Sequence, residues 1–229
     1  MSGTLYGLGV GPGDPELMTV KAWRLIAGAQ VIAYLCANGG DSTALNIAKP
    51  FLPDTFTPIA INMPMKVERE SAQIAYDNGA ERISAALETG CDVMFICEGD
   101  PFFYGSFMYI FERLAAKYKT IVVPGVTSIT AAAAELGQPL AERDEILKVL
   151  PATMSSGKLR DELATCNAAA IIKVGRHFVK VKSVLTDLNL LDHATAVENA
   201  TRSDQIIRPL SNIESDILPY FTTIIVRRK

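Results

Sequence analysis

The stretch that decides the fold is CDVMFICEGDPFFYG, residues 91–105. Its beginning, CDVMFIC, is almost entirely apolar, which is typical of a strand buried on both faces of a parallel sheet. Two carboxylates, Glu98 and Asp100, follow directly, around a glycine and before a proline and three aromatic residues. In open α/β sheets small ligands bind at the carboxyl ends of the strands. The stretch therefore predicts a core strand that ends in a ligand-binding turn.

Strand-like and helix-like segments alternate along the rest of the chain. Strand-like runs lie at residues 4–10, 30–35, 91–97, 119–125, 145–152, 168–175, 194–199 and 220–229. Helices are predicted at 15–29 and at 68–90, the second ending at Gly90. This alternation indicates an α/β protein with largely parallel sheets.

The polar segment GQPLAERDE, residues 137–145, has no apolar periodicity and carries a glycine and a proline. It predicts a boundary between two α/β domains, residues 1–140 and 141–229.

Composition narrows the possible functions. Hydrophobic residues make up 49% of the 229 residues, which indicates a folded core, and the net charge of −3 gives no general attraction to nucleic acid or to anionic membranes. No apolar run approaches the roughly 20 residues of a membrane span, and the first residues look like a strand rather than a signal peptide. The four cysteines form no CxxC pair and there are two histidines, so we expect free thiols in a reducing cytoplasm and no metal site.

The glycine loop GLGVGPGD, residues 7–14, does not match a known phosphate-binding fingerprint. GxGxxG fails from both possible starting glycines, and GxxxxGK[ST] is absent. Pro12 removes an N–H, which suits the wall of a pocket better than a phosphate cradle. The alternative is a structural turn before a helix, capped by Asp14 or Thr19.

Three loops, each after a predicted strand, carry a resemblance to a known family. They are GVGPGDPELMTVKA (9–22), CEGDPFFYGSF (97–107) and VVPGVTSITAAAAELGQPL (122–140). With LPATM, IIKVGR and VENATRSDQ in the second half, the chain resembles the tetrapyrrole (precorrin) methyltransferase family over essentially its whole length. EGDPFFYGSFMY, NMPM and PYFTTIIV are most similar to the branch that methylates C20 of precorrin-2 or of its cobalt form.

The resemblance implies two α/β domains with S-adenosylmethionine (SAM) in the cleft between them, in a homodimer. It assigns cofactor contacts to Pro12, Glu98, Gly99, Asp100, Phe103, Thr127, Ser128, Val174, Ala200 and Thr222. SAM carries an ammonium, a sulfonium and a carboxylate, so a Gly-Asp-Pro turn that supplies carbonyls and a carboxylate suits it.

The implied reaction is SAM-dependent methylation of precorrin-2 at C20, giving precorrin-3A in cobalamin biosynthesis. The alternatives are the cobalt-containing substrate of the anaerobic route and a non-catalytic protein that binds tetrapyrrole or SAM. The electron-rich substrate supplies its own nucleophile, so the protein mainly orients it in a dry cleft. An aspartate implicated as proton acceptor in the uroporphyrinogen branch is replaced here by Tyr34, so that base cannot be carried over. No catalytic residue is assigned, and Tyr34 and Arg176 are the candidates.

A basic run, KVGRHFVKVKS at residues 173–183, could bind the carboxylates of such a substrate. Arg176 is the preferred candidate for a carboxylate clamp. The alternative is a helix face that simply lies in solvent. His177 and His193 fit no catalytic constellation.

Overall fold

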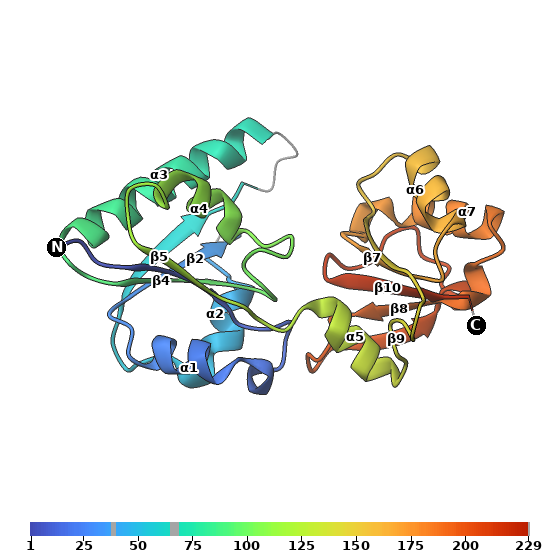
Figure 1. The fold of residues 1–229 in the computed structure, drawn as a ribbon, viewed down its shortest axis with the longest axis horizontal. Coiled ribbons are helices and arrows are strands. Elements are labelled where there is room, and N and C mark those ends of the chain that lie inside the picture. Colours follow the sequence, from blue (N-terminus) through green and yellow to red (C-terminus); the bar gives the residue numbers. More distant parts are fainter. Residues whose placement is uncertain (38–39, 65–68, 229) are drawn as a thin grey trace. The chain divides into compact units, whose positions relative to one another are not determined.

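The computed structural model describes residues 1–37, 40–64 and 69–228 and divides the chain into two compact units, Met1–Thr127 and Ser128–Lys229 (Figure 1). The division precedes the segment at which the sequence predicts it, because helix α5 (Ser128–Leu136) packs on strand β10 (Thr222–Arg227) and so belongs to the second unit. Met65, the last residue of the NMPM motif, lies outside the described residues.

The first unit contains a five-stranded sheet in the order β3-β2-β4-β1-β5, with every neighbouring pair parallel. Its strands are β1 (Leu5–Gly9), β2 (Val31–Cys36), β3 (Thr57–Asn62), β4 (Val93–Cys97) and β5 (Thr120–Val123). Its helices are η1 (Pro15–Leu17), α1 (Val20–Ala27), α2 (Thr43–Ala48), η2 (Lys49–Phe51), α3 (Arg69–Glu88) and α4 (Phe107–Leu114). Figure 1 shows α3 and α4 on one face of the sheet and α1 and α2 on the other.

Strand β4 lies at the centre of this sheet, which explains its apolar sequence. Val93 and Phe95 face the core formed with α3 and α4, whereas Met94 and Ile96 face the core formed with α1 and α2. Successive side chains of a strand point to opposite faces, so a strand covered on both sides needs an unbroken apolar run. The predicted core strand is confirmed.

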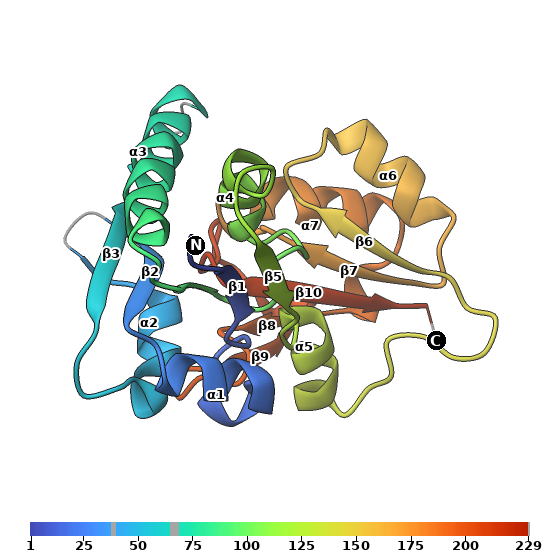
Figure 2. The same ribbon diagram turned by 60° about the vertical axis from the view of Figure 1, so that its left-hand side comes forward.

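The second unit has a mixed five-stranded sheet in the order β6-β7-β10-β8-β9. Its strands other than β10 are β6 (Leu147–Pro151), β7 (Ala168–Ile172), β8 (Ala194–Glu198) and β9 (Ile206–Pro209). Its helices besides α5 are α6 (Ser156–Ala164), η3 (Gly175–His177), α7 (Phe178–Asp187), η4 (Leu191–His193) and η5 (Leu210–Asn212). Strands β6 and β7 are parallel, while β10 runs antiparallel to β7 and β8. Figure 2 shows α6 and α7 on one face of this sheet and α5 on the other.

The polar segment at 137–145 is fixed to the second sheet. Arg227, at the end of β10, is only 4% exposed. Its guanidinium donates to the carbonyl oxygen of Pro139 at 2.8 Å and pairs with Glu145 at 3.0 Å and Glu142 at 3.4 Å. The segment is therefore part of the second unit and not a free linker between two units.

Two strands, β3 and β9, have no counterpart among the predicted runs. Both are edge strands, and each contains a proline, Pro58 or Pro209. Proline cannot donate to the hydrogen-bond ladder and is tolerated mainly at edges, so such strands give a weak sequence signal. In the described part of the chain, no helix combines the length and the apolar character that a membrane span requires.

Candidate functional site

The loops that follow β1, β4 and β5 meet at the carboxyl edge of the first sheet. Gly99 donates its N–H to the carbonyl of Gly11 at 2.8 Å, and Gly11 returns an N–H to Gly99 at 3.4 Å. The loops approach so closely that a Cβ on Gly9 would lie 2.4 Å from the carbonyl oxygen of Gly99, and one on Gly125 only 2.1 Å from it. Sequence reasoning missed Gly9 and Gly125, whose signal is a glycine at or just after the end of a strand.

Asp100 fixes the turn after β4. One carboxylate oxygen accepts the backbone N–H groups of Phe102 and Phe103, both at 2.9 Å. The other accepts the N–H of Gly125 at 3.0 Å and so ties the turn to the loop after β5. The carboxylate is thus engaged with three backbone amides, and it shapes the site by positioning two loops.

Glu98 occupies a different environment at the end of the same strand. Its Oε1 accepts the backbone N–H of Ala44, at the start of α2, at 3.2 Å. Burial raises the pKa of the Glu98 carboxyl, and hydrogen bonds from its own amide and that of Ala44 oppose the rise only in part. Of the two carboxylates of the EGDP turn, Asp100 is bound to the turn itself and Glu98 is directed toward α2.

The aromatic residues of this edge differ in their packing. Phe102 lies 6.0 Å from Phe107 and 5.0 Å from Phe111, measured between ring centroids, and so covers α4. Phe103 is 39% exposed, and its ring contacts that of Tyr104 edge to face. Phe103 is therefore available to a ligand.

Tyr34, a weak catalytic candidate from the sequence, is only 9% exposed. Its side chain belongs to the core between the sheet and helices α1 and α2. Pro12 is half-buried in the loop after β1, and Thr127 follows β5 at the same edge.

The remaining predicted residues belong to the second unit. Val174, Ala200 and Thr222 lie at one edge of its sheet, where β7 and β8 end and β10 begins. The side chain of Val174 is fully buried in the core, so a ligand could reach only its backbone. Thr222 donates its hydroxyl to the carbonyl of Pro219 at 2.8 Å. Ser128 begins α5 and accepts a hydrogen bond from Thr223 at 3.3 Å.

The basic run at 173–183 serves mostly to hold the second unit together. Lys180 donates to the carbonyl oxygens of Ala152 and Met154, each at 2.5 Å, and burial lowers its pKa. Lys182 donates to the carbonyl of Ile213. Arg176 is exposed. Among these three cations, Arg176 remains the candidate for a carboxylate clamp.

His177 lies beside Arg176, with 3.5 Å between Arg176 Nε and His177 Nε2. Burial, and then the positive charges of Lys180 and Arg176, lower the pKa of the His177 imidazole. The lowered pKa favours the uncharged imidazole, so His177 adds little positive charge beside Arg176 at neutral pH.

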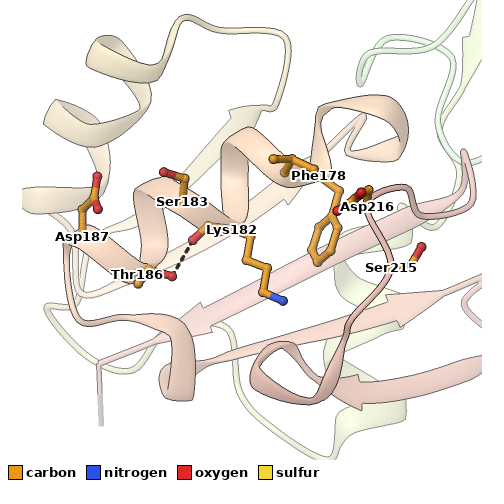
Figure 3. Close-up of a pocket in the computed structure, with 8 residues that line it drawn as sticks. Phe178, Lys182, Ser183, Thr186, Asp187, Ser215 and Asp216 are labelled. Carbon is orange, nitrogen blue, oxygen red and sulfur yellow. Dashed lines mark hydrogen bonds between the residues drawn. The ribbon is translucent and has the colours of Figure 1, made fainter.

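A pocket of about 320 Å³ lies beside α7 and the segment at 215–216 in the second unit (Figure 3). It is lined by Phe178, Val179, Lys182, Ser183, Thr186, Asp187, Ser215 and Asp216. Lys182 of the basic run lies in it, but Arg176 and the residues predicted to contact the cofactor do not. We therefore base the candidate site on the loop geometry of the strand ends.

Three of the four thiols are held in the protonated form, which is a poor nucleophile. The described residues hold all four cysteines in the free state, and burial raises the pKa values of Cys36, Cys97 and Cys166. In the described ranges, no three His, Cys, Asp or Glu side chains are grouped so that they could hold a metal ion. That the protein uses no metal stays a prediction.

Comparison with known proteins identifies relatives of the whole chain. The model of the tetrapyrrole (corrin/porphyrin) methylases matches residues 4–214. The cobalamin biosynthesis protein CobIJ of Mycobacterium bovis is 39% identical over 96% of this chain, which spans only 45% of that protein's length. A Sinorhizobium precorrin-2 C(20)-methyltransferase is 35% identical, and the aligned region covers 98% of this chain and 95% of the relative. A Salmonella typhimurium cobalt-precorrin-2 C(20)-methyltransferase is 31% identical over 100% and 98% of the two chains.

Solved structures share the fold. A uroporphyrin-III C-methyl transferase from Thermus thermophilus, complexed with S-adenyl homocysteine, gives a TM-score of 0.72 at 22% identity and covers 98% of this chain and 92% of its own. A cobalt precorrin-4 methyltransferase gives 0.73 at 23% identity, covering 98% and 94%.

Proposed function

The chain belongs to the tetrapyrrole methylase family, and we propose that it transfers a methyl group from SAM to C20 of precorrin-2, giving precorrin-3A in cobalamin biosynthesis. The observation that carries this proposal is the 35% identity, over nearly the full length of both chains, to a protein named precorrin-2 C(20)-methyltransferase. The turn EGDP after β4, by which the sequence resembles this branch, has a fixed conformation at the carboxyl edge of the first sheet.

We propose that the loops of this edge hold SAM, which supplies an electrophilic methyl group on its sulfonium. Gly9, Gly99 and Gly125 let the three loops approach one another closely at this edge, and Phe103 offers an exposed ring. Backbone carbonyls and the Glu98 carboxylate are suitable partners for the positive groups of SAM. Asp100 acts indirectly, because its carboxylate holds the turn and the neighbouring loop.

In the second unit, Ala200, Thr222 and Ser128 stay proposed contacts of SAM, together with the backbone of Val174. Arg176 is the proposed partner for a carboxylate of the tetrapyrrole, because a guanidinium binds carboxylates through two parallel hydrogen bonds. Its exposed position is compatible with this role.

A second substrate, cobalt-precorrin-2, is favoured by one observation. The Salmonella relative named for that substrate is 31% identical along the entire chain. We propose the metal-free compound first, because the precorrin-2 relative has the higher identity at similar coverage.

The decisive experiment is an anaerobic assay with methyl-labelled SAM and each substrate in parallel. We expect one labelled methyl group at C20 of precorrin-2 and one S-adenosylhomocysteine released for each methyl transferred. Label on a pyrrole ring carbon would assign the protein to another branch. Binding of both ligands without transfer would indicate a non-catalytic binding protein, and absence of transfer to either substrate would refute the assignment.

We also propose that the protein is a homodimer, as the resemblance implies, and that it lies in the cytoplasm, as expected from its free thiols. Light scattering should then give twice the chain mass of 24.7 kDa. A monomer mass at assay concentration, or recovery outside the cytoplasmic fraction, would contradict these two proposals.

A further inference from the structure

The proposed reaction requires the loss of a proton. A π-electron pair of the macrocycle forms the new bond between C20 and the methyl carbon, while the S–CH₃ bond breaks and sulfur keeps its electron pair. The macrocycle is then positively charged and still carries hydrogen at C20. Breaking this C–H bond returns its electron pair to the ring, and the proton needs an acceptor.

Among the described residues at the carboxyl edge of the first sheet, few groups are available to accept this proton. Tyr34 is enclosed in the core, and Cys36 donates its thiol hydrogen to Asn62 at 3.0 Å with its pKa raised by burial. Asp100 is held by three backbone amides. These groups serve packing and loop geometry.

Two further aspartates lie near this edge. Asp14 accepts the N–H of Glu16 at 2.8 Å and caps η1. Asp41 lies in the loop after β2, exposed to solvent, and accepts the side-chain amide of Asn46 at 2.9 Å. Glu98 differs from both because it follows the central strand of the sheet, and it is half-buried there whereas Asp41 is exposed.

We infer that Glu98 is the group that accepts the C20 proton after methyl transfer, an inference that rests on the proposed function. The hydrogen bond from Ala44 engages Oε1 and fixes the direction of the carboxylate. The carboxyl group stands at the end of β4, beside the turn proposed to hold SAM, where the methyl group is transferred.

The protonation behaviour of Glu98 suits this role. A general base is most effective when its pKa lies near the working pH, and burial raises that of Glu98 above its usual range. The amides of Glu98 itself and of Ala44 stabilise the ionised form. Cys97 and Asp100 are its ionisable neighbours along the chain, α2 contributes no charged side chain, and within the described residues no cation pairs with Glu98.

The test is Glu98→Gln in the full chain, with Asp41→Asn as the matched control. Glutamine keeps an oxygen for the N–H of Ala44 but cannot take a proton at neutral pH. We expect kcat to fall by about 10²–10⁴, the range for loss of a general base. The affinity for S-adenosylhomocysteine, measured by calorimetry, should fall far less, because the glutamine keeps an oxygen for the ammonium group of the cofactor. With precorrin-2 deuterated at C20, the variant should show a larger isotope effect on kcat than the wild type, because proton removal becomes rate-limiting.

The pH profile adds a readout that a structural role would not change. The wild-type rate should fall as pH drops through the raised pKa of Glu98, and Glu98→Gln should lack this acidic limb. Four results would overturn the inference: a variant within about twofold of wild type, a loss of S-adenosylhomocysteine binding that matches the loss of rate, an unchanged isotope effect, or a loss in Asp41→Asn instead. If the wild type transfers no label, the proposed function fails first and the inference fails with it.

Discussion

Replacing Asp100 should lower the stability of the fold, and it should lower activity only through that loss. Its carboxylate accepts three backbone N–H groups, two within the turn and one from Gly125. A hydrogen bond to a charged group contributes about 1.5–3 kcal/mol, and the lower half applies here because two of the three bonds lie at the surface. For three such bonds we therefore expect Asp100→Ala to lower the free energy of unfolding by about 4.5–7 kcal/mol.

Asp100→Asn tests the hydrogen bonds within the turn separately from the hydrogen bond to Gly125. The asparagine oxygen can still accept the amides of Phe102 and Phe103, but its NH₂ group then faces the N–H of Gly125. We expect a loss of about 1–3 kcal/mol, from one broken bond and one unpaired donor. S-adenosylhomocysteine should bind more weakly to both variants, because the turn and the neighbouring loop are no longer tied together.

The assay is urea unfolding followed by circular dichroism, combined with calorimetric titration of S-adenosylhomocysteine. Asp92→Ala is the matched control, since Asp92 accepts a single backbone amide, that of Thr4, at 2.7 Å. It should cost about 1 kcal/mol and leave ligand affinity unchanged. The reasoning would be wrong if Asp100→Ala unfolded within 1 kcal/mol of the wild type, or if it lost affinity while its stability stayed intact.

Three further changes test other contacts. Arg227→Met should lower the free energy of unfolding, measured in urea, by about 3 kcal/mol, because the largely buried side chain of Glu145 loses its guanidinium partner. A loss below about 1 kcal/mol would show that the ion pair is solvated. Gly9→Ala should lower the free energy of unfolding by about 1–3 kcal/mol and remove most of the activity, because its Cβ would meet the Gly99 carbonyl. The control is Gly157→Ala, in α6 with open space around it, which should raise the free energy of unfolding by up to about 1 kcal/mol. Equal effects of the two changes would refute the packing argument. Glu98→Gln should be more stable than the wild type at pH 7, and the difference in free energy of unfolding should shrink toward pH 4. The reason is that a carboxyl whose pKa is raised in the folded state destabilises that state once it is ionised. A variant less stable than the wild type at pH 7 would contradict this.

Sequence predicted the central strand and the loops of the first unit because their signals are local. An unbroken apolar run marks β4, and Thr19 caps α1 as a residue of its type should. The second unit was harder, because the antiparallel direction of β10 depends on pairing between segments far apart in the chain. The same limit hid the division between the units, which depends on the packing of α5 against β10.

In the candidate site too, the sequence identified residues of a short motif but not their contacts with segments far away in the chain. The sequence pointed to both carboxylates of the EGDP turn, but their partners come from other segments. Asp100 meets Gly125 and Glu98 meets Ala44, contacts that arise only when parallel strands bring their ends together. Lys180 illustrates the reverse case, since a residue of a promising basic run proves to hold two backbone carbonyls.

The position of β10 in the second sheet also bears on how the protein is made. β10 is the last strand of this sheet to leave the ribosome, yet it lies at the centre, between β7 and β8. Until it emerges, those two strands have no common neighbour, and the segment at 139–145 has no Arg227 to bind. The first unit, with all five of its strands made earlier, can fold during synthesis. The second unit must wait with unpaired strand edges, so slow or interrupted translation ahead of β10 exposes this unit to aggregation and to chaperones.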